Sequence, residues 1–225
     1  MHEGDPPMKT IRLTLSSKNY SSWSLRAGLM AAFSGLPFDE VIVPPGDVGA
    51  RKELLLLSPS ILVPRLQVDE LVVWDTLAIG ETLHELAPKA GLLPSARAER
   101  AHCRAICGEM HSGFASLRAA LPMNLRGDYP GFKVWTRAQD DLERIFEIWR
   151  EALARSGGPF LFGARPGMAD AMYAPVVTRI KTYHVPVDAQ CQVFMEAILA
   201  LPALQAWTAA AREEPDDIEE LDMEF

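Results

Sequence analysis

The sequence predicts an α/β domain over residues 8–88 followed by an all-helical domain over residues 95–212. Residues 8–88 mix short, β-rich alternating segments with helix-like ones. Residues 95–212 hold long helical stretches that are broken only at Pro- and Gly-containing turns. The 225 residues of the chain suffice for two such domains with a substantial hydrophobic core.

The first domain is predicted to begin with a β-α-β unit. Residues 10–15 alternate and are β-rich, and residues 38–43 also read as a strand. Residues 24–33 between them have helical composition and stop at Gly35-Leu36-Pro37, which is a typical helix terminator. Such a unit implies a parallel strand pair with a right-handed crossover.

A further helix, a hairpin and a last helix are expected to complete the first domain. Residues 63–68 and 71–74 flank a two-residue acidic segment, which predicts a tight β-hairpin. Asp75 or Thr76 is then expected to open a helix that runs towards Leu86.

Composition and charge narrow the class of protein. The net charge of −8 argues against a nucleic-acid or anionic-membrane surface. Residues 213–225 contribute eight acidic residues and no basic one, and we expect a flexible, solvated tail there. Cys103, Cys107 and Cys191 are too few for a disulfide framework, and no apolar stretch approaches a membrane span. A cytoplasmic location is therefore expected.

The segment from Asn19 to Arg26 carries the clearest chemical signal. Its hydroxyl and amide side chains lie between a predicted strand and a predicted helix. A helix start directs unpaired N–H groups and the positive end of the helix dipole towards an anion, and a thiolate is one such anion. The alternative is that Ser21 or Ser22 only caps the helix.

Five motifs in this order are similar to those of the glutathione S-transferase family. They are NYSSWSLR (19–26), SPSILVP (58–64), WDTLAI (74–79), EMHSGF (109–114) and MADAMYAP (168–175). The similarity spans roughly residues 9–210 and resembles bacterial serine-type members, with some likeness to the zeta (maleylacetoacetate isomerase) branch. It implies a thioredoxin-like first domain, a helical second domain and a homodimer.

The resemblance implies that a side chain at the helix start hydrogen-bonds the glutathione sulfur. Ser21 is the first choice for this catalytic role and Ser22 the second. Counting back from Arg26, the position that usually carries the family's hydroxyl falls on Asn19, with Tyr20 next. A free thiol has a pKa near 8.5, and a helix N-terminus with one donor lowers it by about one unit or more.

The resemblance also implies a glutathione-binding set in the first domain. Val63-Pro64 matches the family's cis-proline loop, where the Val63 backbone pairs with the cysteinyl unit. Asp75 and Thr76 match the acidic-hydroxyl pair that receives the γ-glutamyl end, with Thr76 on its carboxylate and Asp75 on its ammonium group. Leu62 stands where many relatives carry lysine or glutamine, so it lacks their contact with the glycyl carboxylate.

In the second domain, Asp170 is expected to be structural. It lies three residues after Gly167, the spacing of a capping box, and can accept a hydrogen bond from the Gly167 N–H group. His111 follows Cys103 and Cys107 on one predicted helix face, but ligands along one straight helix splay too far apart for a metal, so none is expected.

His111, Phe114 and Arg118 are instead the candidates to line an acceptor pocket, because the resemblance places this helix near the cleft. The chain is thus expected to be a glutathione transferase with glutathione as cosubstrate and a small hydrophobic electrophile. Conjugation for detoxification, isomerisation and peroxide reduction all begin with the same thiolate. The alternative is a non-catalytic binding or scaffold protein that keeps this fold.

Overall fold

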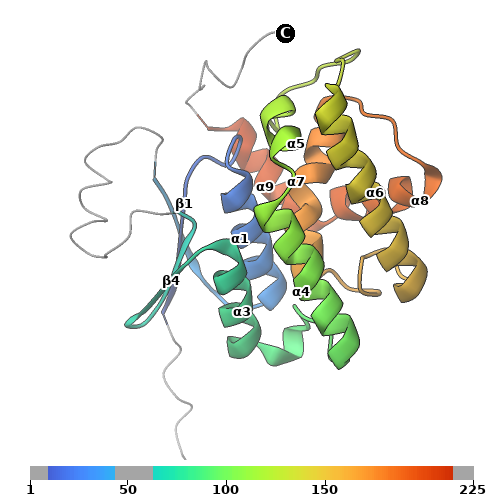
Figure 1. Ribbon diagram of the computed structural model, residues 1–225. Helices are drawn as coiled ribbons and strands as arrows, with labels where there is room; N and C mark the ends of the chain where they lie inside the picture. The colour runs from blue at the N-terminus through green and yellow to red at the C-terminus, as the bar shows by residue number, and fades with distance from the viewer. Residues whose placement is uncertain (1–9, 44–62, 215–225) are drawn as a thin grey trace, which may run out of the picture.

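The computed structural model describes residues 10–43 and 63–214 of the chain. Within them, the N-terminal part contains a mixed four-stranded sheet with strand order β2-β1-β3-β4 and helices on one side of it (Figure 1). Its elements are β1 (Ile11–Leu15), α1 (Ser22–Ser34), β2 (Asp39–Ile42), β3 (Arg65–Val68), β4 (Leu71–Trp74) and α3 (Thr76–Leu86).

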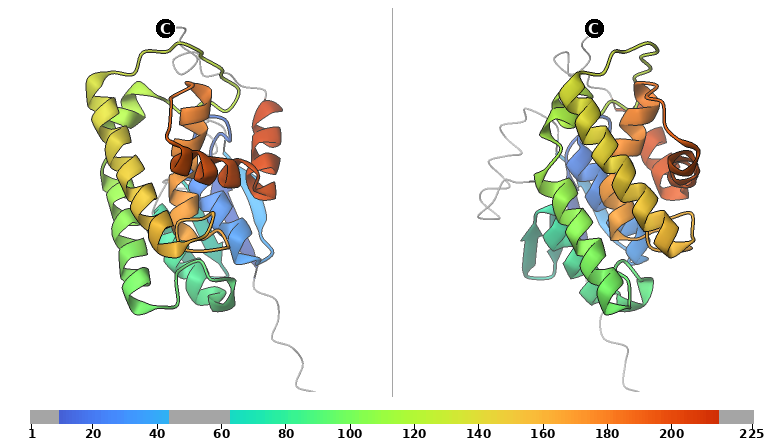
Figure 2. Two further views of the ribbon diagram at one scale, coloured as in Figure 1. Left: turned by 90° about the vertical axis from the view of Figure 1, so that its right-hand side faces the viewer. Right: turned by 45° about the vertical axis from the view of Figure 1, so that its right-hand side comes forward.

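The rest of the described chain is helical, as the sequence predicts. After the short 3₁₀ helix η1 (Pro88–Ala90) come α4 (Arg97–Ser112), α5 (Ala115–Ala120), α6 (Thr136–Ser156), α7 (Met168–Thr182), α8 (Ala189–Leu199) and α9 (Pro202–Arg212). Figure 2 shows α4 and α6 along one side of this part and α9 on the other, with α7 between them.

The predicted strand pairing is confirmed. β1 pairs in parallel with β2 and antiparallel with β3, and β3 and β4 form the predicted antiparallel hairpin. Gly35 ends α1 in the left-handed conformation with φ of 69°, which glycine adopts at little cost. The helix expected between β2 and β3 lies outside the described residues.

Helix α7 forms the centre of the molecule because it is mostly apolar and is buried along almost its whole length. It packs against α1 and α4, and Figure 1 shows these helices side by side. Arg26 of α1 is fully buried, and its Nε donates a hydrogen bond of 2.8 Å to the carbonyl of Met172 in α7. The N-terminal α/β part and the helical part therefore share one core.

The start of α7 is held by Asp170. Its carboxylate accepts hydrogen bonds from the N–H group of Gly167 (2.8 Å), as predicted, and from that of Leu161 (2.9 Å). Burial of the carboxyl raises the pKa of Asp170 to about 7, although both hydrogen bonds favour the ionised form. Asp170 thus holds the start of α7 in place, although burial disfavours its ionised form.

In the described residues, no single helix is long and apolar enough to cross a membrane. Taken together, α8 and α9 reach that length and composition, but they are bent by 69° to each other.

Replacing Asp170 with asparagine is expected to change how stability depends on pH. Between 3.8 and about 7 the unfolded chain ionises Asp170 while the folded chain keeps it protonated, so the wild type loses stability as the pH rises through this range. The free energy of unfolding of the wild type should therefore fall relative to Asp170→Asn, by up to about 4 kcal/mol. Urea denaturation across this range measures the difference.

Asp188 supplies a control of opposite sign. It caps α8 by accepting from the Cys191 N–H group, which lowers the pKa of its carboxyl. The stabilisation by ionised Asp188 is complete above the pKa of this carboxyl in the unfolded chain, and it is lost as the pH falls through the lowered pKa of the folded chain. The difference between wild type and Asp188→Asn should thus stay flat over the range in which Asp170 acts. Parallel curves for wild type and Asp170→Asn would contradict the assignment.

Gly28 is expected to be required for the packing of α1 against α9. A Cβ atom at Gly28 would lie 2.2 Å from the ring of Trp207, which is a rigid indole and not the end of a flexible side chain. Gly28→Ala should lower the free energy of unfolding by about 1–3 kcal/mol. Gly108 lies within α4 with nothing within 4 Å of an added Cβ, so Gly108→Ala should instead stabilise by about 0.5–1 kcal/mol. Equal effects in thermal unfolding would refute the packing argument.

Candidate active site

A pocket of about 370 Å³ lies between the start of α1, the chain before β3, the β4–α3 junction and the end of α4. Its lining residues are Trp23, Val63, Pro64, Trp74, Asp75, Thr76 and His111. The structure therefore brings together the whole glutathione-binding set that the sequence predicts, with one of the acceptor-pocket candidates.

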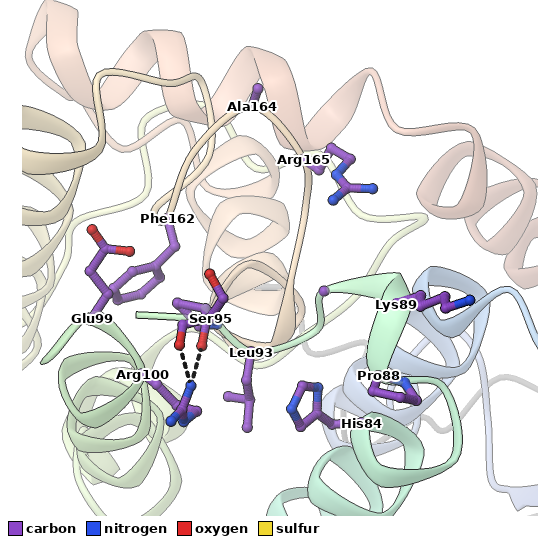
Figure 3. A pocket seen from close by; sticks show the side chains of 12 residues that line it. His84, Pro88, Lys89, Leu93, Ser95, Glu99, Arg100, Phe162, Ala164 and Arg165 are labelled. Carbon is purple, nitrogen blue, oxygen red and sulfur yellow. Dashed lines mark hydrogen bonds between the residues drawn. The ribbon is translucent and has the colours of Figure 1, made fainter. Parts of the chain in front are cut away.

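A larger pocket of about 640 Å³ lies at the opposite ends of α3 and α4 (Figure 3). Lys89 and Arg165 line it, and Arg100 donates to the carbonyls of Pro94 and Ser95 at its wall. It contains none of the residues predicted for catalysis or glutathione binding, so the predicted chemistry belongs to the smaller pocket.

The loop before β3 has the predicted geometry. The peptide bond between Val63 and Pro64 is cis, as predicted, and both residues line the pocket. This places the Val63 backbone where an extended peptide can reach it. Leu62, whose lost contact with the glycyl carboxylate the sequence suggests, lies outside the described residues.

Asp75 is held in an unusual backbone conformation at the start of α3. Its φ of 77° is rare for a residue other than glycine and marks local strain. One carboxylate oxygen accepts from the Leu77 N–H group (2.8 Å), and the other lies 2.6 Å from His111 Nε2. The carboxylate thus already joins the helix start to α4, and a ligand ammonium group would share it with His111.

Thr76 is the best-placed group for a carboxylate. Thr76 is 1% exposed and lines the pocket, and its hydroxyl has no hydrogen-bond partner among the described residues. Leaving such a group unpaired costs about 1–3 kcal/mol, which a bound acceptor would offset. At the N-terminus of α3, where the helix dipole is positive, such a hydroxyl would suit an anionic oxygen.

Ser21 is the N-cap of α1, so the capping alternative is confirmed for this serine. Its Oγ accepts from the Ser24 N–H group (3.2 Å) and donates to Ser24 Oγ (3.0 Å). Ser22 is buried, and its hydroxyl accepts from Arg26 Nη1 (3.1 Å). The N–H groups of Ser22 and Trp23 lack an acceptor among the described residues, so they remain donors at the helix start.

Asn19 and Tyr20 face the helical domain. Asn19 is fully buried: its Oδ1 accepts from the N–H groups of Leu125 and Arg126, and its Nδ2 donates to Asn124 Oδ1 (3.0 Å). Tyr20 is also buried, and its hydroxyl accepts from Arg126 Nη2 (3.2 Å). These bonds use both ends of the Asn19 amide, which argues against its donating to a thiolate. Ser21 is the predicted thiolate partner that is not buried.

Trp23 and Trp74 are pocket residues that sequence reasoning did not assign to it. The sequence carried a signal for each of them, because Trp23 follows the N-cap Ser21 by two residues and Trp74 directly precedes Asp75. The His111 ring lies 5.2 Å from that of Trp23, and the Arg118 guanidinium lies 5.8 Å from it. Phe114 is only 7% exposed and packs in the core instead.

Positive charge gathers behind Trp23. The Arg26 guanidinium lies 4.5 Å above its ring, and burial, then Arg179 and Arg118, lower the pKa of Arg26. Burial, then Arg118, lowers the pKa of Arg179 to about 10. Arg26 Nη2 and Arg179 Nη1 are buried without a partner, and among the described residues none of these arginines forms an ion pair. An anion near Trp23 would therefore be stabilised.

No group of three or more His, Cys, Asp or Glu side chains in the described part of the chain could hold a metal ion. The three cysteines are buried and free, and the hydrogen bond with Cys103, followed by burial, raises the pKa of the Cys107 thiol. None of them lines the pocket, so the arrangement suits a thiol that arrives with a ligand.

Two curated relatives align with most of this chain. Maleylacetoacetate isomerase from Rattus norvegicus is 28% identical over 190 residues, which cover 82% of this chain and 87% of that protein. Maleylacetoacetate isomerase from Pseudomonas aeruginosa is 27% identical over 191 residues, which cover 80% and 87%.

Solved structures agree in fold. Maleylacetoacetate isomerase from Anaeromyxobacter dehalogenans, determined with bound dicarboxyethyl glutathione and citrate, is 26% identical with a TM-score of 0.65, covering 94% of this chain and 95% of that one. A glutathione transferase homologue from Burkholderia, with bound glutathione, is 24% identical with a TM-score of 0.68, covering 91% and 99%.

Two domain families match the two parts of the chain in order. Residues 20–86 match the glutathione S-transferase N-terminal domain, and residues 133–210 match the glutathione S-transferase C-terminal domain. Together with relatives that align along most of the sequence, these matches show that the chain belongs to the glutathione S-transferase family.

Proposed function

We propose that this protein is a glutathione-dependent enzyme that activates the glutathione thiol for attack on a small electrophile. The observation that carries the proposal is a single pocket that joins the cis Val63-Pro64 loop, the hydroxyl of Thr76 and the start of α1. These groups match, in order, the cysteinyl backbone, the γ-glutamyl carboxylate and the thiol of extended glutathione.

Activation of the thiol needs only local electrostatics. The positive end of α1 and the N–H groups of Ser22 and Trp23 favour the thiolate over the thiol. Ser21 would add a donor if its hydroxyl turned from Ser24 to the sulfur. The protein itself then forms no covalent bond, because the thiolate of the cosubstrate is the nucleophile.

The electrophile best supported by this site has an apolar body and a carboxylate. Trp23 and Trp74 provide apolar walls. Arg118 lies 5.8 Å from the Trp23 ring without lining the pocket, and it adds positive charge together with Arg26 and Arg179. Relatives named maleylacetoacetate isomerase, and one solved with dicarboxyethyl glutathione and citrate, support an anionic electrophile. Isomerisation and conjugation therefore both fit, and peroxide reduction would start from the same thiolate. If the enzyme conjugates such an electrophile with glutathione, the reaction would serve detoxification.

The oligomeric state and location are part of the same proposal. We infer a homodimer, which is the assembly that the resemblance to the glutathione S-transferase family implies. We infer a cytoplasmic enzyme, because buried free cysteines suit a reducing compartment. A non-catalytic scaffold has no specific support, since the pocket keeps an unpaired hydroxyl and a free helix start.

Thr76→Val should weaken glutathione binding. The substitution keeps the size of the side chain but removes the hydroxyl that is unpaired in the pocket, so the Kd for glutathione should rise about tenfold. Isothermal titration calorimetry of the purified protein measures it. Wild-type protein that binds no glutathione at millimolar concentration would overturn the proposed function.

Thr82 provides the matched control on the same helix. Its hydroxyl donates to the Ala78 carbonyl (2.8 Å) and is exposed, so Thr82→Val should leave glutathione affinity unchanged. Equal weakening by both variants would mean that Thr76 acts through the stability of α3 and not through the ligand.

Ser21→Ala should raise the pKa of bound glutathione if the Ser21 hydroxyl donates to the sulfur. Loss of one donor to the thiolate would shift the pH midpoint of kcat/KM upwards by about one unit and lower kcat/KM at neutral pH about tenfold. Loss of the cap would also cost about 1 kcal/mol of stability. Turnover of chlorodinitrobenzene across pH provides the profile.

Ser22→Ala is the control because the Ser22 hydroxyl is buried and bonded to Arg26. It should leave the pH midpoint in place. An unchanged midpoint in Ser21→Ala would exclude its hydroxyl and assign the thiolate to the N–H groups of Ser22 and Trp23.

A further inference from the structure

We propose that Glu214 is a positioning residue for the thiol-activating end of α1, because its carboxylate fills an anion-binding nest in the loop between β1 and α1. The importance of that loop for catalysis rests on the function proposed above. The sequence assigns residues 213–225 to a flexible tail, yet the side chain of Glu214 is bound to the folded domain.

The nest consists of consecutive donors on one short stretch. Glu214 Oε2 accepts from the Ser17 hydroxyl (2.8 Å) and from the Asn19 N–H group (3.1 Å), and Oε1 accepts from the Lys18 N–H group (2.5 Å). Successive N–H groups that converge on one point form a concave anion site. Hydrogen bonds to a charged acceptor are shorter and stronger than neutral ones, so one carboxylate fixes the loop at three points.

Ser17 passes this constraint on to the helix start. Its hydroxyl donates its only proton to Glu214, which leaves a lone pair directed at the Tyr20 N–H group (3.1 Å). The Ser17 carbonyl accepts from the N–H group of Ser21 (3.1 Å), the N-cap of α1. The charge of Glu214 thus orders the bonds that place Ser21 and the first turn of α1, whose Trp23 lines the pocket.

The rest of the C-terminal segment holds the same loop from the other side. Trp207 Nε1 of α9 donates to the Lys18 carbonyl (2.9 Å), and the Lys18 ammonium lies 4.9 Å above the Trp207 ring. Arg126 Nη1 donates to the backbone carbonyl of Glu214 (3.2 Å). Both polar groups of the Lys18 peptide unit are therefore bound by residues nearly 200 positions away in the chain.

Loss of the Glu214 charge is expected to affect the binding of the glutathione peptide and the stabilisation of its thiolate differently. Val63-Pro64 and Thr76 lie on other elements, so they should still hold the peptide when the loop moves. Ser21 and the N–H groups of Ser22 and Trp23 would shift away from the sulfur. Loss of the Glu214 charge should therefore reduce thiolate formation much more than glutathione affinity.

The test uses full-length Glu214→Gln, with Glu213→Gln as the neighbouring control because Glu213 is exposed and Glu214 is not. In Glu214→Gln, amide hydrogen exchange at Lys18 and Asn19 should accelerate about tenfold or more, since an amide cannot serve three donors as a carboxylate does. The pH midpoint for thiolate formation by bound glutathione, followed by ultraviolet absorbance, should rise by about one unit. Glu214→Asp should restore part of both.

Hydrogen exchange tests the nest, and the thiolate midpoint tests the positioning role. Unchanged exchange at Lys18 and Asn19 in Glu214→Gln would overturn the nest itself, whatever the activity. Faster exchange with an unchanged thiolate midpoint would overturn the positioning role, since a loss of folded protein lowers turnover but does not move that midpoint. Wild-type protein without glutathione binding would refute the proposed function and still leave the exchange experiment to decide on the nest.

Discussion

The rest of the structure depends on the burial of α1 between the sheet and α7. The Arg26 guanidinium donates to the Met172 carbonyl in the middle of α7, so the two parts of the chain share a polar contact inside one core. Breaking this contact would leave the Nε donor of a buried guanidinium without its acceptor, which is costly. Arg26 thus fixes α1 one turn into the helix, whereas the N-cap Ser21 is held by the Ser17 carbonyl in the loop before it. The position of the helix start therefore also depends on what that loop meets in the helical domain.

The pocket is built at the meeting point of elements that are far apart in sequence. Asp75 ties the start of α3 to His111 at the end of α4, so the γ-glutamyl end of a ligand would sense the position of the helical domain. Asn19 ties the loop before α1 to the chain after α5 in the same way. Residues that look like ligands for glutathione in the sequence thus also bond the two parts of the chain to each other. A ligand held by Asp75 would therefore contact a residue that also joins the two parts of the chain.

Local patterns were sufficient for most of the fold and for one side of the site. The ends of α1 and α3, the hairpin and the cis Val63-Pro64 bond depend on short-range geometry and on a recognisable order of motifs, so the sequence predicted them. The roles of Asn19 and Glu214 depend on long-range contacts. Asn19 bonds to Glu214, which is 195 positions away in the chain, and to Asn124, which is 105 positions away. No periodicity or spacing reports such contacts, which is why Asn19 looked like a thiolate donor and Glu214 like part of a solvated tail.

Ser21 shows why capping and catalysis need not exclude each other. Its hydroxyl donates to Ser24 Oγ and accepts from the Ser24 N–H group. A hydroxyl rotates freely, so it can keep accepting that N–H group while its proton turns to a sulfur anion. Ser24 Oγ would not be left without a donor, because it also accepts from the Ser16 N–H group (3.0 Å). The network therefore lets Ser21 exchange acceptors at little cost, as a residue that both holds a helix and meets a thiolate requires.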